Sequence, residues 1–318
     1  MIRLPAVAHS HSHSYALRRL AQALMLGALV QIWGCALQGH SGQADTGPVA
    51  LDARPNGLAV RPDDGAVYLT DDATSSVLRS SDGRSFSRYA GVPIGAGQAA
   101  SLSQIAFDAE GNLLVERFGF GTAGGLFSIA GADHVVALAG LDPTRRRLGL
   151  ASAGAHRALS TWFKGGGEGA ATGGLSLVTY DAATGEARER DLVTGLGKPV
   201  GVVVLGDKVF IADQARNAIV SASLPALVAA AQPVSNLDVF ARIAHPDLMA
   251  GDPATGALYT RCNAASVCRI AADGTVSEIA NGFHDARGVA LNSARRVLYV
   301  VDRAASGGTS YLRSVPLP

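Results

Sequence analysis

One pattern recurs along the chain and constrains its fold more than any other feature. It consists of a small residue, a short apolar strand, a polar turn, a second strand and a closing Asp, and it is clearest in residues 56–71, 200–213 and 287–302. Fainter copies lack the closing Asp and begin at Ser103, Leu148 and Pro246. The first strands of the six copies lie about 41 to 52 residues apart, a spacing typical of the four-stranded blades of a propeller.

The repeat predicts an all-β fold, a six-bladed β-propeller, over residues 47–318. The last copy provides only three strands, whereas the strand-like residues 47–53 have no partner in the first copy. We expect this N-terminal strand to complete the last blade, because such a closure removes an exposed sheet edge. An insertion that begins at Pro225 predicts a short helix between the two outer strands of the fourth blade.

Composition excludes one class of partner. The formal net charge is +1, aromatic residues make up 6% of the chain, and no long run of Lys or Arg occurs. A nucleic-acid-binding surface needs a concentration of positive charge, so we expect no DNA or RNA partner. The short run Arg145–Arg147 is interpreted as a solvated loop, and the single closed domain is expected to be monomeric.

The first 35 residues have the pattern of an export signal. Arg18 and Arg19 precede an apolar run that is too short to span a bilayer comfortably. The run ends at Cys35 in a sequence that resembles the bacterial lipobox, which predicts lipidation of this Cys and a membrane anchor. The alternative is cleavage after Ala36, which would release a periplasmic or secreted protein. Both interpretations place the protein in the cell envelope or beyond, with residues 36–46 as a linker.

Two further cysteines suggest an oxidising compartment. Cys262 is expected at the end of a second strand and Cys268 in the third strand of the same blade. A hairpin would bring the pair close enough for a disulfide, which favours export. The alternative is a pair of buried thiols that act as small apolar residues.

Three carboxylates at matching repeat positions are candidates for chemistry at the mouth of the channel, where loops before first strands and after second strands meet. These are Asp71, Asp213 and Asp302. Carboxylate oxygens are ligands that Ca²⁺ and Mg²⁺ prefer. The alternative is structural, because an Asp after a strand can accept backbone N–H hydrogen bonds.

Basic and titratable residues at the same end could bind a ligand. Arg117 and Arg287 could bind a carboxylate or a phosphate group, and His284 could transfer a proton near neutral pH. Together with Asp213, these residues form the candidate ligand-binding set. The alternatives are neutralisation of the neighbouring Asp residues and a solvated loop histidine.

The segment from Pro55 to Asp71, PNGLAVRPDDGAVYLTD, resembles a blade of the SMP-30/gluconolactonase family, within the wider group that includes NHL-repeat propellers. The resemblance implies one divalent cation, Ca²⁺, Mg²⁺ or Zn²⁺, held by a Glu, the Asn of this segment and a later Asp. Asn56 matches that Asn, and Asp71 or Asp302 would act as the catalytic base. No Glu opens a blade here, since the next blade begins with Ser103 and Gln104.

Two hypotheses about function follow. The first is an exported, lipid-anchored propeller that binds a small polar molecule, or an envelope protein, at the channel mouth. The alternative is a divalent-metal-dependent hydrolase of sugar lactones or related esters.

Overall fold

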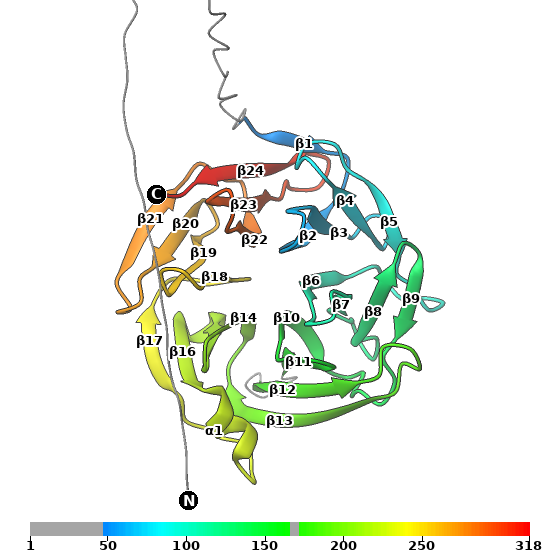
Figure 1. Cartoon of the computed structure of the whole chain (residues 1–318), viewed down its shortest axis with the longest axis vertical. Coiled ribbons are helices and arrows are strands. Elements are labelled where there is room, and N and C mark those ends of the chain that lie inside the picture. The colour runs from blue at the N-terminus through cyan, green and yellow to red at the C-terminus, as the bar shows by residue number, and fades with distance from the viewer. Residues whose placement is uncertain (1–46, 166–171) are drawn as a thin grey trace, which may run out of the picture. The chain divides into compact units, whose positions relative to one another are not determined.

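The computed structural model describes residues 47–165 and 172–318, and it confirms the predicted all-β, six-bladed propeller. Six four-stranded antiparallel sheets surround a central axis, and the chain passes from one sheet to the next in order (Figure 1). The predicted signal sequence, the predicted lipobox with Cys35 and the predicted linker 36–46 lie outside the described residues. Within the described ranges, no helix has the length and apolar character needed to cross a membrane.

The sheets are arranged with the first strand of each blade nearest the axis and the last at the perimeter (Figure 1). The first three blades are β2 (Pro55–Val60), β3 (Val67–Asp71), β4 (Ser76–Ser80) and β5 (Ser87–Gly91); β6 (Leu102–Phe107), β7 (Leu113–Arg117), β8 (Gly125–Gly131) and β9 (His134–Ala137); and β10 (Arg146–Ser152), β11 (Arg157–Lys164), β12 (Thr172–Tyr180) and β13 (Ala187–Leu196). The next two are β14 (Pro199–Leu205), β15 (Lys208–Asp213), β16 (Ala218–Ser223) and β17 (Asp238–Arg242); and β18 (Ala250–Asp252), β19 (Ala257–Asn263), β20 (Ser266–Ile270) and β21 (Val276–Ala280).

The sixth sheet combines strands from both ends of the propeller domain. It contains β22 (Ala286–Asn292), β23 (Val297–Asp302), β24 (Ser310–Pro316) and β1 (Val49–Leu51), in the order β1-β24-β23-β22. The outer strand β1 pairs antiparallel with β24, from Val49 opposite Leu312 to Leu51 opposite Ser310.

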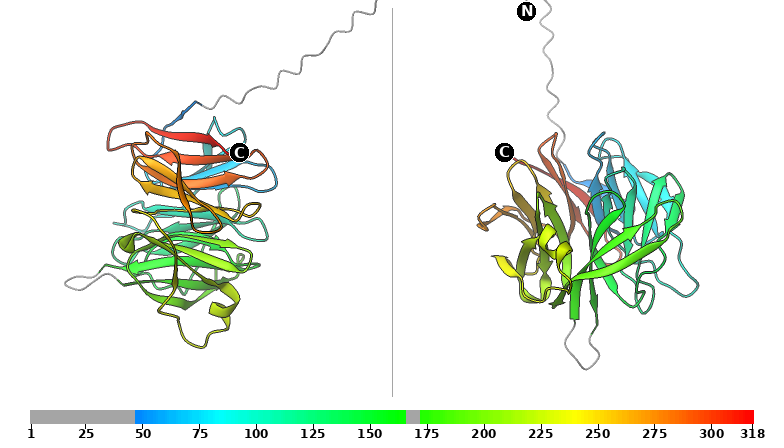
Figure 2. Two further views of the ribbon diagram at one scale, coloured as in Figure 1. Left: turned by 90° about the vertical axis from the view of Figure 1, so that its left-hand side faces the viewer. Right: turned by 60° about the horizontal axis from the view of Figure 1, so that its bottom comes forward.

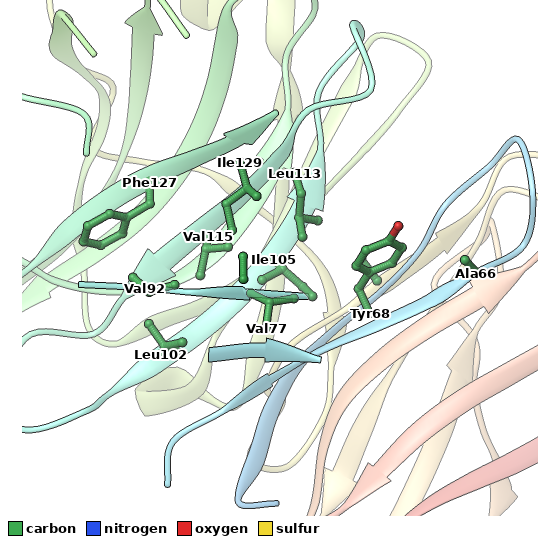
Figure 3. Packing of buried hydrophobic residues seen from close by; sticks show 12 residues of the cluster. Ala66, Tyr68, Val77, Val92, Leu102, Ile105, Leu113, Val115, Phe127 and Ile129 are labelled. Atoms are coloured by element: carbon green, nitrogen blue, oxygen red, sulfur yellow. The ribbon is translucent and has the colours of Figure 1, made fainter. Parts of the chain in front are cut away.

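Apolar side chains fill the spaces between neighbouring blades. Between the first two blades, the buried Tyr68 and Val77 pack with residues of the second blade, among them Leu113, Val115 and Ile129 (Figure 3). The Tyr68 ring also makes edge-on contacts with Tyr89 and Phe107, each at a centroid distance of 5.2 Å. Burial of each large apolar side chain stabilises the fold by about 1.5–3 kcal/mol, so these interfaces hold the ring together.

The inner strands approach each other so closely that a side chain would not fit at some positions. A Cβ atom added to Gly57 would lie against the carbonyl oxygen of Ser103 in the next blade. At the same place, Thr70 Oγ1 accepts a hydrogen bond from Gly57 N at 2.8 Å and donates one to Ser103 O at 3.2 Å. The glycine at the start of the repeated pattern therefore permits close contact between blades.

The insertion in the fourth blade contains the predicted helix. Helix α1 (Leu224–Ala229) lies between β16 and β17, at the outside of the ring (Figures 1 and 2). The Ser223 hydroxyl accepts a hydrogen bond from Ala226 N at 3.4 Å, and Pro225 occupies the first turn. Ser at the N-cap and Pro in the first turn favour a helix start, which explains why this segment is helical.

The two cysteines of the fifth blade lie on paired strands, as the sequence predicts. Cys262 is in β19 and Cys268 is in β20, with their Cα atoms 5.6 Å apart and their sulfur atoms at disulfide distance. The pairing of the two strands therefore places the thiols where a disulfide can form.

Candidate functional site

A cavity of about 600 Å³ lies at the channel mouth, and all six blades contribute to its wall. The wall combines charged, polar and aromatic groups with aliphatic side chains. The lining residues are Arg54, Asn56, Asp72, Ala100, Ser101, Leu102, Phe118, Phe120, Arg146, Leu148, Phe163, Lys198, Val200, Gln214, Asp247, Leu248, Arg287 and Arg303.

The structure places only some of the predicted site residues at this cavity. Asn56 and Arg287 line it. The other candidates lie outside its lining: Asp71, Asp302, Arg117, Asp213 and His284.

The three matching aspartates hold the mouth loops in place. Each is buried and accepts backbone hydrogen bonds from the residues just before the first strand of its own blade. Asp71 Oδ1 accepts from Arg54 N at 2.8 Å, and the carboxylate oxygens of Asp213 accept from Gly197 N at 2.9 Å and Lys198 N at 3.0 Å.

Asp302 follows the same rule, because its Oδ1 accepts from His284 N at 2.8 Å and from Asp285 N at 3.3 Å. These bonds are the structural alternative that the sequence left open. They fix the loops from which the cavity is built.

Arg117 and His284 also make local contacts. The guanidinium of Arg117 lies 4.6 Å from the Phe127 ring centroid and donates to the carbonyl oxygen of Pro93. The exposed His284 places Nδ1 3.4 Å from Asp302 Oδ2 and borders a separate cavity of about 380 Å³. Neither residue contributes to the wall of the larger cavity.

Asp72 is a cavity residue that the sequence analysis did not single out. Its Oδ2 lies 3.2 Å from Arg303 Nη2, whereas its buried Oδ1 has no hydrogen-bond partner in the structure. Desolvation raises the pKa of this carboxyl to about 6, against the opposing effects of Arg303, Arg54 and the backbone N–H of Leu102. A carboxylate with a free oxygen and such a pKa can accept a proton near neutral pH.

A second carboxylate, Asp247, precedes the first strand of the fifth blade and belongs to a dense ion-pair cluster. Its Oδ2 is 3.3 Å from Arg261 Nη2 and 3.3 Å from Arg287 Nη1. Both arginines also bind Asp285. Arg261 Nη1 lies 2.8 Å from its Oδ1, and Arg287 Nε lies 2.7 Å from its Oδ2. Burial raises the pKa of Asp247, although the two arginines act in the opposite direction.

The run Arg145–Arg147 is not a solvated loop, which corrects that interpretation. Arg147 is fully buried, and its Nη2 lies 2.8 Å from Glu189 Oε2. Arg145 Nη1 lies 2.8 Å from Glu189 Oε1 and 2.6 Å from Asp191 Oδ1. Arg146, between them, lines the cavity instead.

The described residues do not supply the donor set that the family resemblance implies for a divalent cation. Asn56 donates from Nδ2 to Leu102 O at 3.1 Å, and its amide oxygen would be one ligand. Among residues 47–165 and 172–318, no three His, Cys, Asp or Glu side chains come together as possible ligands. Glu116 is fully buried away from the cavity and accepts from Ser160 Oγ at 2.5 Å. Hard cations need several oxygen ligands, so these residues do not fit one.

Comparison with known proteins finds likeness in structure alone. No protein-family model matches the sequence, and no curated protein sequence is significantly similar to it. A gluconolactonase from Xanthomonas campestris superposes with a TM-score of 0.61 at 15% identity, over 84% of this chain and 86% of that protein.

Two further solved structures superpose as well. A calcium-binding regucalcin from Agrobacterium tumefaciens gives a TM-score of 0.60 at 14% identity, over 86% of this chain and 94% of its own. A luciferin-regenerating enzyme superposes with a TM-score of 0.62 at 13% identity, over 85% of this chain and 95% of its own. The protein thus has the six-bladed β-propeller fold that gluconolactonase and regucalcin proteins share.

Proposed function

We propose that the protein is an exported, lipid-anchored propeller that binds a small polar molecule in the mouth cavity. The observation that carries this proposal is the cavity itself, because the ring of blades builds one concave site from residues of all six blades. Its volume of about 600 Å³ lies within the range of small-molecule sites. A wall with charged groups, amides and aromatic rings suits a ligand with both polar and apolar parts.

The binding proposal is tested with the purified domain, residues 47–318. A thermal-shift and calorimetric panel of sugars, sugar acids and organic acids should contain at least one compound that binds at a single site. The Leu148→Trp variant fills the cavity from one of its lining residues and should abolish that binding. Binding that survives Leu148→Trp, or a panel without any binder, would contradict the proposal and favour a protein partner in the envelope.

Export and lipid anchoring rest on the sequence of residues 1–35. Expression of the full chain in a bacterial host with labelled palmitate should label the wild type and place it in the membrane fraction. The Cys35→Ser variant should lose the label and leave the membrane fraction. Equal labelling of both forms would contradict lipidation of Cys35.

A second candidate is a hydrolase of sugar lactones or related esters, which the free oxygen of Asp72 favours. In this scheme Asp72 accepts a proton from a water molecule as the water oxygen bonds to the lactone carbonyl carbon. The ring C–O bond then breaks, and the leaving alkoxide takes the proton from Asp72 to give the hydroxy acid. Arg303, 3.2 Å from Asp72, holds the carboxylate in place.

The hydrolase candidate is tested by following acid release from gluconolactone above its spontaneous rate. The rate should rise with pH through about 6, where Asp72 loses its proton. The Asp72→Asn variant should lose the hydrolysis above the spontaneous rate. The matched control Asp52→Asn changes an exposed aspartate and should leave the rate unchanged. A rate equal to the spontaneous one, or full activity in Asp72→Asn, would exclude this candidate.

A further inference from the structure

The three consecutive arginines before and in β10 differ in their partners. Arg145 and Arg147 are neutralised by Glu189 and Asp191, which lie on β13, the outer strand of the same sheet. Side chains alternate along a strand, so Arg146 points the other way, into the cavity. Among the residues that the structure describes, no carboxylate lies within ion-pair distance of Arg146. Its guanidinium contacts aromatic rings instead.

Lys198 is a second cation of the cavity wall without a carboxylate partner in the described part of the chain. Its Nζ donates to Gln214 Oε1 at 2.7 Å, and Gln214 is itself held by a hydrogen bond from Nε2 to Pro246 O at 3.1 Å. Burial lowers the pKa of Lys198; Asp247 opposes this effect, and Arg261 and Arg287 add to it.

One aromatic ring lies beside both cations. The centroid of Phe163 is 5.9 Å from Arg146 Cζ and 5.9 Å from Lys198 Nζ. Phe118 extends the aromatic surface, with its centroid 5.8 Å from that of Phe163 and 5.7 Å from Arg146 Cζ. We call Arg146, Lys198, Phe118 and Phe163 the basic aromatic wall.

The two carboxylates of the cavity are each paired with cations outside the basic aromatic wall. Asp72 is paired with Arg303, and Asp247 is paired with Arg261 and Arg287. Arg54 also lines the cavity and acts on Asp72, whereas Arg146 and Lys198 lie together on the basic aromatic wall. Half-buried charge is costly unless it is paired, so this wall is the place where an anion would be stabilised most.

We infer that the basic aromatic wall binds the carboxylate of a small organic acid whose apolar or aromatic body packs against Phe163 and Phe118. This inference rests on the proposed binding function and names its ligand class. The planar guanidinium of Arg146 matches a carboxylate through two parallel hydrogen bonds, while Lys198 adds a second charge. The aromatic rings give the body of the ligand an apolar surface on which to pack.

The test uses calorimetry with benzoate, benzamide and acetate on the purified full chain. Benzamide keeps the ring and removes the charge, whereas acetate keeps the charge and removes the ring. Benzoate should bind at least about tenfold more tightly than either, because only benzoate uses both the cations and the rings. Equal affinity for benzoate and benzamide would overturn the inference.

Charge variants locate the site. Arg146→Gln and Lys198→Gln should each weaken benzoate binding about tenfold and change benzamide binding less than about twofold. The matched controls Arg157→Gln and Lys208→Gln remove exposed cations at the turns between first and second strands, at the opposite end of the channel, and should bind benzoate as the wild type does. Wild-type affinity in both Arg146→Gln and Lys198→Gln would overturn the inference.

Two outcomes separate this inference from the proposed function. Neutral polar compounds that bind in the cavity and are blocked by Leu148→Trp, without any binding of benzoate, would refute the inference and retain the binding function. If no compound binds, neutral or anionic, both this inference and the proposed binding function are refuted.

Discussion

At the scale of single residues, Asp213 illustrates how carboxylates at the ends of second strands organise the site. It is fully buried and accepts backbone N–H groups of Gly197 and Lys198, and Lys198 lines the cavity. The carboxylate therefore positions the loop that carries a binding group without contributing to the cavity wall itself.

Loss of this carboxylate should destabilise the protein. In Asp213→Ala, two partly buried N–H groups lose their buried acceptor, and the free energy of unfolding should fall by about 2–4 kcal/mol. Urea denaturation measures the change, with the exposed Asp207→Ala as the control. An effect no larger than that of the control would contradict the structural role.

Asp72 should make stability depend on pH. Its pKa is raised by desolvation to about 6 in the folded state, so folding favours the protonated form. Its contribution to stability is therefore present at pH 4 and is lost as the pH rises through 6. Relative to Asp72→Asn, the wild type should lose about 2–3 kcal/mol of unfolding free energy between pH 4 and pH 7. A difference that stays constant with pH would contradict the raised pKa.

The sequence could place Asn56 and Arg287 at the mouth because the repeat register locates every first strand. It could not distinguish Asp71 from Asp72, which are adjacent. The structure directs the first toward the N–H of Arg54 and the second into the cavity. Which of two neighbouring carboxylates is left with a free oxygen depends on groups far away in sequence, here Arg303.

At the scale of elements, β1 shields the outer edge of the last blade. It pairs with β24 and buries Leu51 against the cluster that contains Leu69 and Leu312. Removal of β1 should therefore expose both an unpaired strand edge and apolar surface.

A truncation tests this role of β1. A chain that starts at Asp52 should unfold at a free energy about 2–5 kcal/mol below that of a chain that starts at Gly47, and it should aggregate more readily. Urea denaturation and light scattering measure the two effects. Identical stability of the two chains would show that β1 contributes nothing to closure.

The cysteine pair of β19 and β20 gives a separate prediction. If Cys262 and Cys268 form a disulfide, neither should react with an alkylating reagent in the denatured, unreduced protein. The double variant Cys262→Ser/Cys268→Ser should lose about 2 kcal/mol of unfolding free energy, as the short loop predicts. Free thiols in protein purified from an oxidising compartment would contradict the disulfide.

Elements were predictable where the signal is local. The alternation of apolar residues, the turn residues and the insertion at Pro225 indicated the blades and the helix without tertiary information. The interpretation of Arg145–Arg147 as a solvated loop was wrong for the opposite reason. The partners of these cations, Glu189 and Asp191, lie on β13, at the far edge of the same blade.

At the scale of the whole molecule, closure of the ring brings unpaired cations and paired carboxylates to one cavity. This arrangement resembles an anion site more than a cation site. Addition of EDTA, Ca²⁺ or Zn²⁺ should therefore shift the melting temperature by less than about 1 °C, because only a ligand that binds the folded state stabilises it. Stoichiometric metal in the purified protein, lost together with stability on treatment with EDTA, would contradict this expectation.

The central claim is that the ring of blades builds a binding site for a small organic anion at the channel mouth. A crystal structure of the domain soaked in benzoate tests it most directly. The account predicts one benzoate in the mouth cavity, with its carboxylate bound by Arg146 and Lys198 and its ring against Phe163. An empty cavity at saturating benzoate, or a carboxylate bound away from both cations, would contradict the account.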